Sequence, residues 1–464
     1  MAAHVTTEST RYALIGTPEG DTLVLWDTPG FGDSARLARR LAQQGNPIGW
    51  FLTQVWDRFR DRPFYLSQKA VRNVRDDADV VLYLVNASEA PADAGYLAPE
   101  LDVLAWIGRP VFVVLNQTGQ PRPRAEEEVE EARCREAMGK RPLVHGVLTL
   151  DAFARCWVQE VVLLRVLAPA IAAEKQTAYE RLVVAWQARR NAQFEEAMAA
   201  LATPISRAAS DKVTLPNSSF WKTLEEAWRR TVSGQKGNAA QQRAAQVLAE
   251  RLDMGLREST ERLIAIHGLE GHAADEVRDR LARVRTDAPM HEGTAALLGG
   301  VVSGALSGLA ADLVAHGLTF GAGTLLGAIA GALGGAGLAR GFNVIRGRSE
   351  SEVRWDDELL DGLVASALLR YLAVAHFGRG RGECKESEYP QFWRELVKQA
   401  IDAQRAALAA LWAQRADAAD HTNIEAGLRA ILGEAARAVL DRLYPGATSV
   451  TTMPKTGFIR STAA

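Results

Sequence analysis

A change of rhythm near residue 151 constrains the fold of this chain more than any other feature. Before it, apolar runs of strand length recur at 12–15, 23–26, 80–85 and 111–115, each followed by turn residues and a stretch with helical spacing. After it the strands stop, and Ala-, Leu-, Arg- and Glu-rich segments with apolar residues at helical intervals fill 152–200, 220–267 and 275–284. The sequence predicts an α/β domain with a mostly parallel sheet and flanking helices, followed by a large all-α region.

Charge and cysteine content exclude several classes of protein. The 464 residues contain 54 Lys and Arg against 56 Asp and Glu, a balance that argues against a protein that coats nucleic acid. The three cysteines, Cys134, Cys156 and Cys384, are too few and too widely spaced for a disulfide framework or a zinc knuckle. A reducing cytoplasm is therefore the expected compartment.

The second apolar run leads directly into a short polar motif. Residues 23–31 read Leu-Val-Leu-Trp-Asp-Thr-Pro-Gly-Phe, an apolar strand that ends in Asp-x-x-Gly. In a nucleotide-binding α/β domain this places the Asp27 carboxylate at the carboxyl end of a strand, where it reaches Mg²⁺. The backbone amide of Gly30 then approaches the terminal phosphate, which a side chain would obstruct.

This string resembles the third motif of the translation-factor class of small GTPases, especially its Era and TrmE branch. Two further features fall in the matching order. Thr7 precedes the first strand, at the place of the switch threonine that completes the Mg²⁺ shell, and Asn116 ends an apolar strand at the place of the base-recognition motif Asn-Lys-x-Asp. The resemblance implies a P-loop fold that binds GTP or GDP with Mg²⁺ through Thr7, Asp27, Gly30 and Asn116.

The chain departs from that family at three positions. Gln117 and Gly119 replace the motif's Lys and Asp, so hydrogen bonding that would reject adenine has no evident source. Phe31 stands where Ras-like enzymes carry the Gln that orients water, and it cannot take that role. The catalytic residue for hydrolysis is therefore unassigned.

A larger departure is the phosphate loop. No Gly-x-x-x-x-Gly-Lys-Ser/Thr occurs in the 464 residues, and in the family this loop and its strand come about twenty residues before the switch threonine. Because that strand is central in the family's sheet, we expect a truncated GTPase that binds nucleotide poorly and hydrolyses GTP only with the missing segment. The alternative is a pseudo-GTPase, a non-catalytic membrane or scaffold protein that uses the α/β remnant for protein interaction.

Glycine is concentrated late in the chain, where 15 of 39 glycines lie within 293–348. Charge-free runs at 294–311 and 317–339 would make helices of roughly 27 and 34 Å, close to the thickness of a bilayer's hydrocarbon core. Their glycines recur every four residues, at 300, 304 and 308 and again at 323, 327, 331 and 335, as in closely packed helix pairs. We expect a helical hairpin through 294–339 that docks on or in the inner membrane; the same composition also fits a hairpin buried in the helical domain.

The helical remainder, with helices expected at 353–376, 389–415 and 423–443, resembles the domain of unknown function 3482 that follows certain bacterial Era-like GTPases. The likeness rests on residues 150–157, the glycine hairpin and residues 368–382. The expected domains are a GTPase-like domain at 1–150, helices at 151–292, the hairpin at 293–348, further helices at 349–445 and a tail at 446–464. The resemblance implies a GTP-hydrolysing switch that acts on a protein effector and forms a homodimer.

Overall fold

The computed structural model describes thirteen stretches of the chain: residues 9–28, 30–31, 33–42, 62–89, 94–117, 124–138, 141–150, 156–216, 239–269, 342–346, 350–376, 391–415 and 422–445. The described residues up to Arg190 form one compact unit, and those from Asn191 to Pro445 form a second. The division falls inside a long helix.

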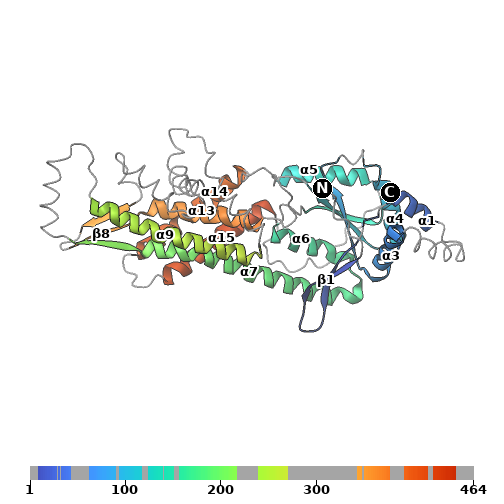
Figure 1. Ribbon diagram of the computed structural model, residues 1–464, viewed down its shortest axis with the longest axis horizontal. Coiled ribbons are helices and arrows are strands. Elements are labelled where there is room, and N and C mark those ends of the chain that lie inside the picture. Colours follow the sequence, from blue (N-terminus) through green and yellow to red (C-terminus); the bar gives the residue numbers. More distant parts are fainter. Residues whose placement is uncertain are drawn as a thin grey trace. The chain divides into compact units, whose positions relative to one another are not determined.

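The first unit alternates strands and helices (Figure 1). Its elements are β1 (Thr10–Gly16), β2 (Thr22–Asp27), α1 (Ser34–Ala42), α3 (Arg62–Asp77), β3 (Val81–Asn86), α4 (Leu97–Ile107), β4 (Val111–Asn116), α5 (Arg124–Met138), β5 (Val144–Thr149), α6 (Trp157–Leu167), two 3₁₀ turns (Ala168–Ala170 and Ala173–Lys175) and the first part of α7 (Gln176–Ser210). The expected α/β class and its parallel sheet are confirmed, because β3, β4 and β5 pair in parallel in that order.

The middle strand of the parallel sheet, β4, is covered on both faces, which explains its unbroken apolar run. Val111, Val113 and Leu115 of β4 face one cluster of buried residues, built with α1, α3, α4 and α5. Phe112, between them, faces a second cluster, built with α6 and α7. This alternation is the two-residue period of a strand, and Figure 1 shows α5 and α6 on opposite sides of the sheet.

A separate two-stranded sheet precedes the parallel one. β1 and β2 form an antiparallel hairpin whose turn is closed by a hydrogen bond from Thr17 N to Asp21 O of 3.0 Å. Arg181 of α7 binds the Asp21 carboxylate at 2.8 Å and holds the pKa of Asp21 below its usual range. Among the described residues, no backbone pairing joins β2 to β3, although Leu23 of β2 and Leu82 of β3 pack against the same α6-side cluster.

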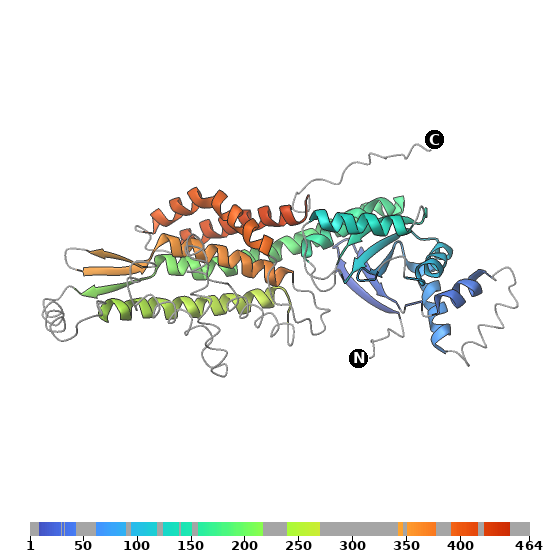
Figure 2. The ribbon, with the colours of Figure 1, turned by 90° about the horizontal axis from the view of Figure 1, so that it is seen from above.

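The second unit is mainly helical and contains the rest of α7, α9 (Ala239–Ile266), α13 (Asp357–Ala375), α14 (Gln391–Gln414) and α15 (Thr422–Leu443). The helices α9, α14 and α15 each contact α13 and run alongside it (Figures 1 and 2). The expected helices at 389–415 and 423–443 are confirmed as α14 and α15. The predicted large helical region is therefore present.

The expectation that strands stop after residue 151 is wrong. β6 (Lys212–Pro216), β8 (Glu350–Trp355) and β7 (Phe342–Arg346) form an antiparallel sheet in that order. These strands are short and carry charged residues that pair across them, such as Lys212 with Glu352 at 2.8 Å, so they lack a strand's apolar signature. The helix expected at 353–376 begins later than predicted, because its first residues belong to β8. It is α13, which starts at Asp357 and is capped by the Asp356 carboxylate, the acceptor of a hydrogen bond from Leu359 N at 2.7 Å.

A proline inside α7 makes a testable packing contact. Pro204 has no N–H to donate to Ala200 O, and the Ser259 hydroxyl of α9, 5% exposed, donates to that carbonyl at 2.7 Å instead. Ser259→Ala should lower the free energy of unfolding by about 1–3 kcal/mol, because a buried carbonyl loses its donor. In the double variant that combines Ser259→Ala with Pro204→Ala, a new helical N–H at residue 204 should restore most of the lost stability. Urea unfolding of both variants provides the test, and a double variant as unstable as Ser259→Ala alone would contradict the assignment.

The predicted glycine hairpin, 294–339, lies outside the described residues. Of its expected domain, only the β7 residues at 342–346 are described. In the part of the chain that the structure covers, no helix combines the length and apolar character needed to cross a bilayer.

Candidate functional site

The carboxyl edge of the parallel sheet is the candidate site. Each of its strands ends in a polar residue: Asn86 in β3, Asn116 in β4 and Thr149 in β5. Asn86 is the register partner of Asn116, and Thr149 is that of Leu115, so the three ends lie side by side. In open parallel sheets this edge is where ligands bind, since loops diverge there and leave a crevice.

Asn86 closes a tight turn with its own side chain. The Ser88 backbone N–H and hydroxyl both donate to Asn86 Oδ1, at 3.0 and 2.7 Å. The Ala87 N–H donates to Asn116 O at 2.8 Å, which ties this turn to the end of β4. The Asn86 side chain is therefore held in one orientation beside Asn116.

Gln117, directly after Asn116, adopts a left-handed backbone conformation with φ of 59°. Residues other than glycine avoid this region, at a cost of roughly 1 kcal/mol, and such strain is concentrated at functional sites. The chain therefore turns sharply as it leaves β4, at the residue that follows the predicted base-contact asparagine.

The end of β5 carries a buried carboxylate and an unsatisfied hydroxyl. Thr149 N donates to Glu131 Oε1 of α5 at 3.0 Å, and Glu131 is only 6% exposed. The Thr149 Oγ1 atom is buried and has no hydrogen-bond partner among the described residues. Most buried hydroxyls have a partner, so this atom is a candidate contact for a bound group.

The structure describes three of the four predicted site residues. Asn116 lies at the carboxyl edge of the parallel sheet, whereas Asp27, the exposed last residue of β2, lies on the β1–β2 hairpin. Gly30 is exposed, and a Cβ added there would meet nothing within 4 Å, so the described contacts impose no requirement for glycine. Thr7 lies outside the described residues.

Asp27 presents a single exposed carboxylate at the end of β2. Mg²⁺ bound to a nucleotide needs only one or two carboxylates, since phosphates and water complete its shell. The described residues contain no group of three or more His, Cys, Asp and Glu side chains able to hold a metal. Trp26 and Thr28 beside Asp27 line a cavity of about 20 Å³, far smaller than a ligand pocket.

Phe31 points toward the protein core. It packs against the α4-side cluster, with its ring centroid 6.4 Å from that of Tyr83 in β3. The aromatic ring after the Asp-x-x-Gly motif therefore anchors this segment to the sheet.

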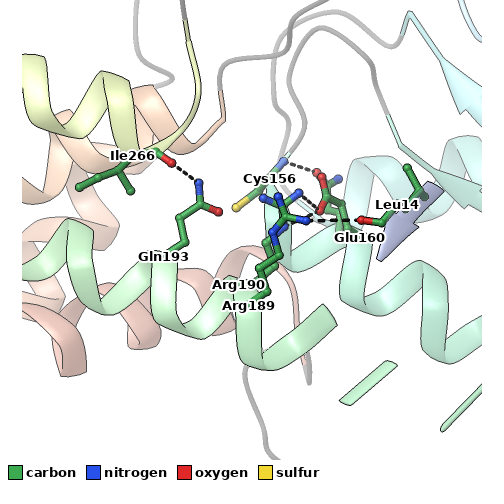
Figure 3. A network of polar contacts seen from close by, with 8 residues as sticks. Leu14, Cys156, Glu160, Arg189, Arg190, Gln193 and Ile266 are labelled. Carbon is green, nitrogen blue, oxygen red and sulfur yellow. Dashed lines mark hydrogen bonds and ion pairs between the residues drawn. The ribbon is translucent and has the colours of Figure 1, made fainter. Parts of the chain in front are cut away.

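A second polar network joins α6, α7 and β1, and is shown in Figure 3. Arg190 donates to Glu160 Oε2 at 2.6 and 2.9 Å, and Arg189 donates to the Leu14 carbonyl of β1 at 3.4 Å. Beside them, burial raises the pKa of the Cys156 thiol to about 12. Cys156 is therefore protonated near neutral pH and does not serve as a thiolate nucleophile.

The sequence did not single out Asn86, Gln117 or Glu131 as site residues. Asn86 had a usable signal, since an Asn two residues before a Ser at the end of an apolar run is typical of a side-chain-closed turn. No sequence signal indicates the burial of Glu131, because its segment of α5, Glu-Glu-Glu-Val-Glu-Glu, is typical of a solvent-exposed helix face.

The comparisons with known proteins identify one family. Residues 135–444, more than half of the chain, match the model of the family described as Domain of unknown function (DUF3482). No curated protein and no solved structure matches the chain. The match begins in α5 and ends at Tyr444, so it covers the end of the α/β unit and almost all of the helical unit. The chain belongs to the DUF3482 family.

Proposed function

We propose that this chain is a guanine-nucleotide-binding switch of the Era-like type, with its nucleotide site at the carboxyl edge of β3, β4 and β5. The observation that carries the proposal is the pairing of Asn86 with Asn116 at the ends of neighbouring parallel strands, beside the strained Gln117. Two apolar strands that each end in a polar side chain on the same face form a ready binding edge.

Each residue has a role in this proposal. Asn116 contacts the base on the α6 side of the sheet. Thr149 is the register partner of Leu115, so its side chain lies on the α4 side and does not contact that base. Asp27 would hold Mg²⁺, which neutralises charge on the phosphates, and the Gly30 amide would approach the terminal phosphate. Because the sequence contains no glycine-lysine phosphate loop, we expect affinity in roughly the high-micromolar to millimolar range.

The helical unit would carry the response to the nucleotide. We propose that it acts on a protein effector at the cytoplasmic face of the inner membrane, that residues 294–339 dock there, and that the chain works as a homodimer. The glycine spacing of 294–339 and the arginines that flank it, such as Arg285 and Arg340, support membrane docking.

Saturation-transfer NMR of the full chain with millimolar GTP and Mg²⁺ tests the nucleotide site. Asp27→Ala and Asn116→Ala should each weaken binding by about tenfold, equal to the loss of one charge-assisted or buried hydrogen-bonding contact. Asp77→Ala, at the exposed end of α3, is the matched control and should bind as the wild type does. Wild-type protein that gives no signal at millimolar GTP would refute the proposal.

The departures at Gln117 and Gly119 favour a second candidate, the non-catalytic scaffold. A scaffold would bind membranes or a protein partner without any response to nucleotide. Sedimentation of the full chain with vesicles of anionic lipid, with and without GTP, separates the two functions, because only the switch should show nucleotide-dependent binding.

A further inference from the structure

The side-chain amide of Asn86 is held in one orientation, in which its oxygen accepts hydrogen bonds and its nitrogen points away from them. Ser88 N–H can only donate a hydrogen bond, so the Asn86 atom that it meets at 3.0 Å must be the oxygen, Oδ1. The Ser88 hydroxyl donates to the same atom at 2.7 Å. The side-chain nitrogen, Nδ2, is therefore turned away from the turn.

Nδ2 is an accessible hydrogen-bond donor. Among the described residues it has no hydrogen-bond partner, and it is not one of the buried unsatisfied atoms. Two bonds to Oδ1 hold the amide plane, so little side-chain entropy is lost when Nδ2 binds an acceptor. The turn therefore presents a pre-oriented N–H donor at the edge of the sheet.

This donor lies beside Asn116 on the same face of the sheet. The two residues are register partners in neighbouring parallel strands, which are spaced about 4.8 Å apart. The preceding residues, Val85 and Leu115, both face the α4-side cluster, so Asn86 and Asn116 both face the opposite, α6 side. A planar base held by Asn116 is within reach of Asn86.

We infer that Asn86 selects a 6-oxopurine base, through a hydrogen bond from Nδ2 to the oxygen on C6; this inference rests on the proposed nucleotide site. Guanine and hypoxanthine carry an acceptor oxygen at C6, whereas adenine carries an amino group that donates. With adenine, the Asn86 Nδ2 group and the amino group on C6 are both donors, so they face each other without a hydrogen bond between them. The structure thus offers a source for the adenine rejection that Gln117 and Gly119 do not supply.

The expected size of this selection follows from one hydrogen bond. Leaving a donor unpaired in a binding site weakens binding by about five- to 150-fold. ITP isolates the contact, because hypoxanthine keeps the oxygen on C6 but lacks the amino group on C2. GTP and ITP should therefore bind within about twofold of each other, and both about tenfold more tightly than ATP.

Two substitutions at Asn86 test the assignment in the full chain, with saturation-transfer titrations of GTP, ITP and ATP in the presence of Mg²⁺. Asn86→Asp keeps an acceptor for Ser88 but replaces the donor with a carboxylate oxygen, so ATP should bind at least as tightly as GTP. Asn86→Ala removes the donor without adding an acceptor and should bring the GTP-to-ATP ratio near one. Circular dichroism shows whether either variant has unfolded, and the wild-type comparison of the three nucleotides stands without them.

The ratio between nucleotides separates this inference from the proposal on which it rests. The triphosphate is common to all three ligands, so repulsion of phosphate by the new carboxylate would weaken them equally and leave the ratio unchanged. An unchanged ratio in a folded variant, or ITP that binds the wild type no more tightly than ATP does, would overturn the role of Asn86 while leaving the site intact. Absence of all binding by the wild type would instead overturn the site itself.

Discussion

Val85→Asp should unfold the α/β unit, whereas Leu84→Asp should leave it folded. Val85 is 3% exposed and faces the α4-side cluster, but Leu84, its neighbour in β3, is 61% exposed. A carboxylate at position 85 would be buried without a partner, and we expect a loss of more than about 4 kcal/mol in the free energy of unfolding. At position 84 the same carboxylate remains in water, and the loss should stay within about 1 kcal/mol.

Leu84 lies in β3, which is an edge strand of the parallel sheet among the described residues. Val81 N donates to Pro110 O and Ala87 N to Asn116 O, so the odd-numbered residues of β3 direct their backbone groups to β4. Leu82 and Leu84 direct theirs to the other edge, where no strand pairs with β3 among the described residues. Urea unfolding of the two variants followed by far-UV circular dichroism provides the test; equal losses at 84 and 85 would show that β3 is not placed as described.

His376 should make the helical unit less stable as the pH falls from about 6.5 to about 4. The residue is 4% exposed, and burial lowers its pKa from 6.5 to about 4, although its Nδ1 bonds Leu372 O at 2.7 Å. Above pH 6.5 the ring is neutral in the folded and the unfolded chain, and the full stability is present. Below it the unfolded chain takes up a proton that the folded chain does not, so the free energy of unfolding falls by about 3 kcal/mol by pH 4.

Two variants separate this titration from packing. His376→Phe should remove this part of the pH dependence. If the variant is less stable than the wild type at pH 7.5, the difference between the two proteins should be smaller, or reversed, at pH 5. Trp393→Phe changes the ring that lies 4.7 Å from His376 without removing a titratable group, and its loss of stability should be similar at both pH values. Urea midpoints measured at pH 7.5, 6 and 5 would contradict the account if wild type and His376→Phe showed the same pH dependence.

The fold was predictable where apolar pattern alone decides it. The runs at 12–15, 23–26 and 111–115 lie in strands, and the run at 80–85 lies in β3 except for its first residue. The run at 111–115 is buried on both faces, whereas residues 12–15 are exposed or half-buried. β5 was not anticipated, since it contains Gly146, a residue that weakens a strand. A side chain there would lie 3.1 Å from the Phe112 ring, so glycine makes room for an aromatic residue of the next strand, a relation that a sequence pattern does not show.

The candidate site was predictable only in part, for a similar reason. Asn116 was found because a strand that ends in Asn matches a known motif. Asn86 depends on pairing with Asn116 across the sheet, and its free donor depends on the contact with Ser88, which are both properties of the folded chain. The roles of Thr7, Asp27, Gly30 and Asn116, and the hairpin at 294–339, stay predictions from the sequence.

Hydrogen–deuterium exchange of the full chain, with and without millimolar GTP and Mg²⁺, tests the nucleotide site most directly. The account predicts slower exchange in the peptides that contain residues 84–89 and 115–117, where Asn86, Asn116 and Gln117 lie, and unchanged exchange in the interior of α13. Identical exchange at the carboxyl edge of the sheet, or protection confined to the helical unit, would contradict it.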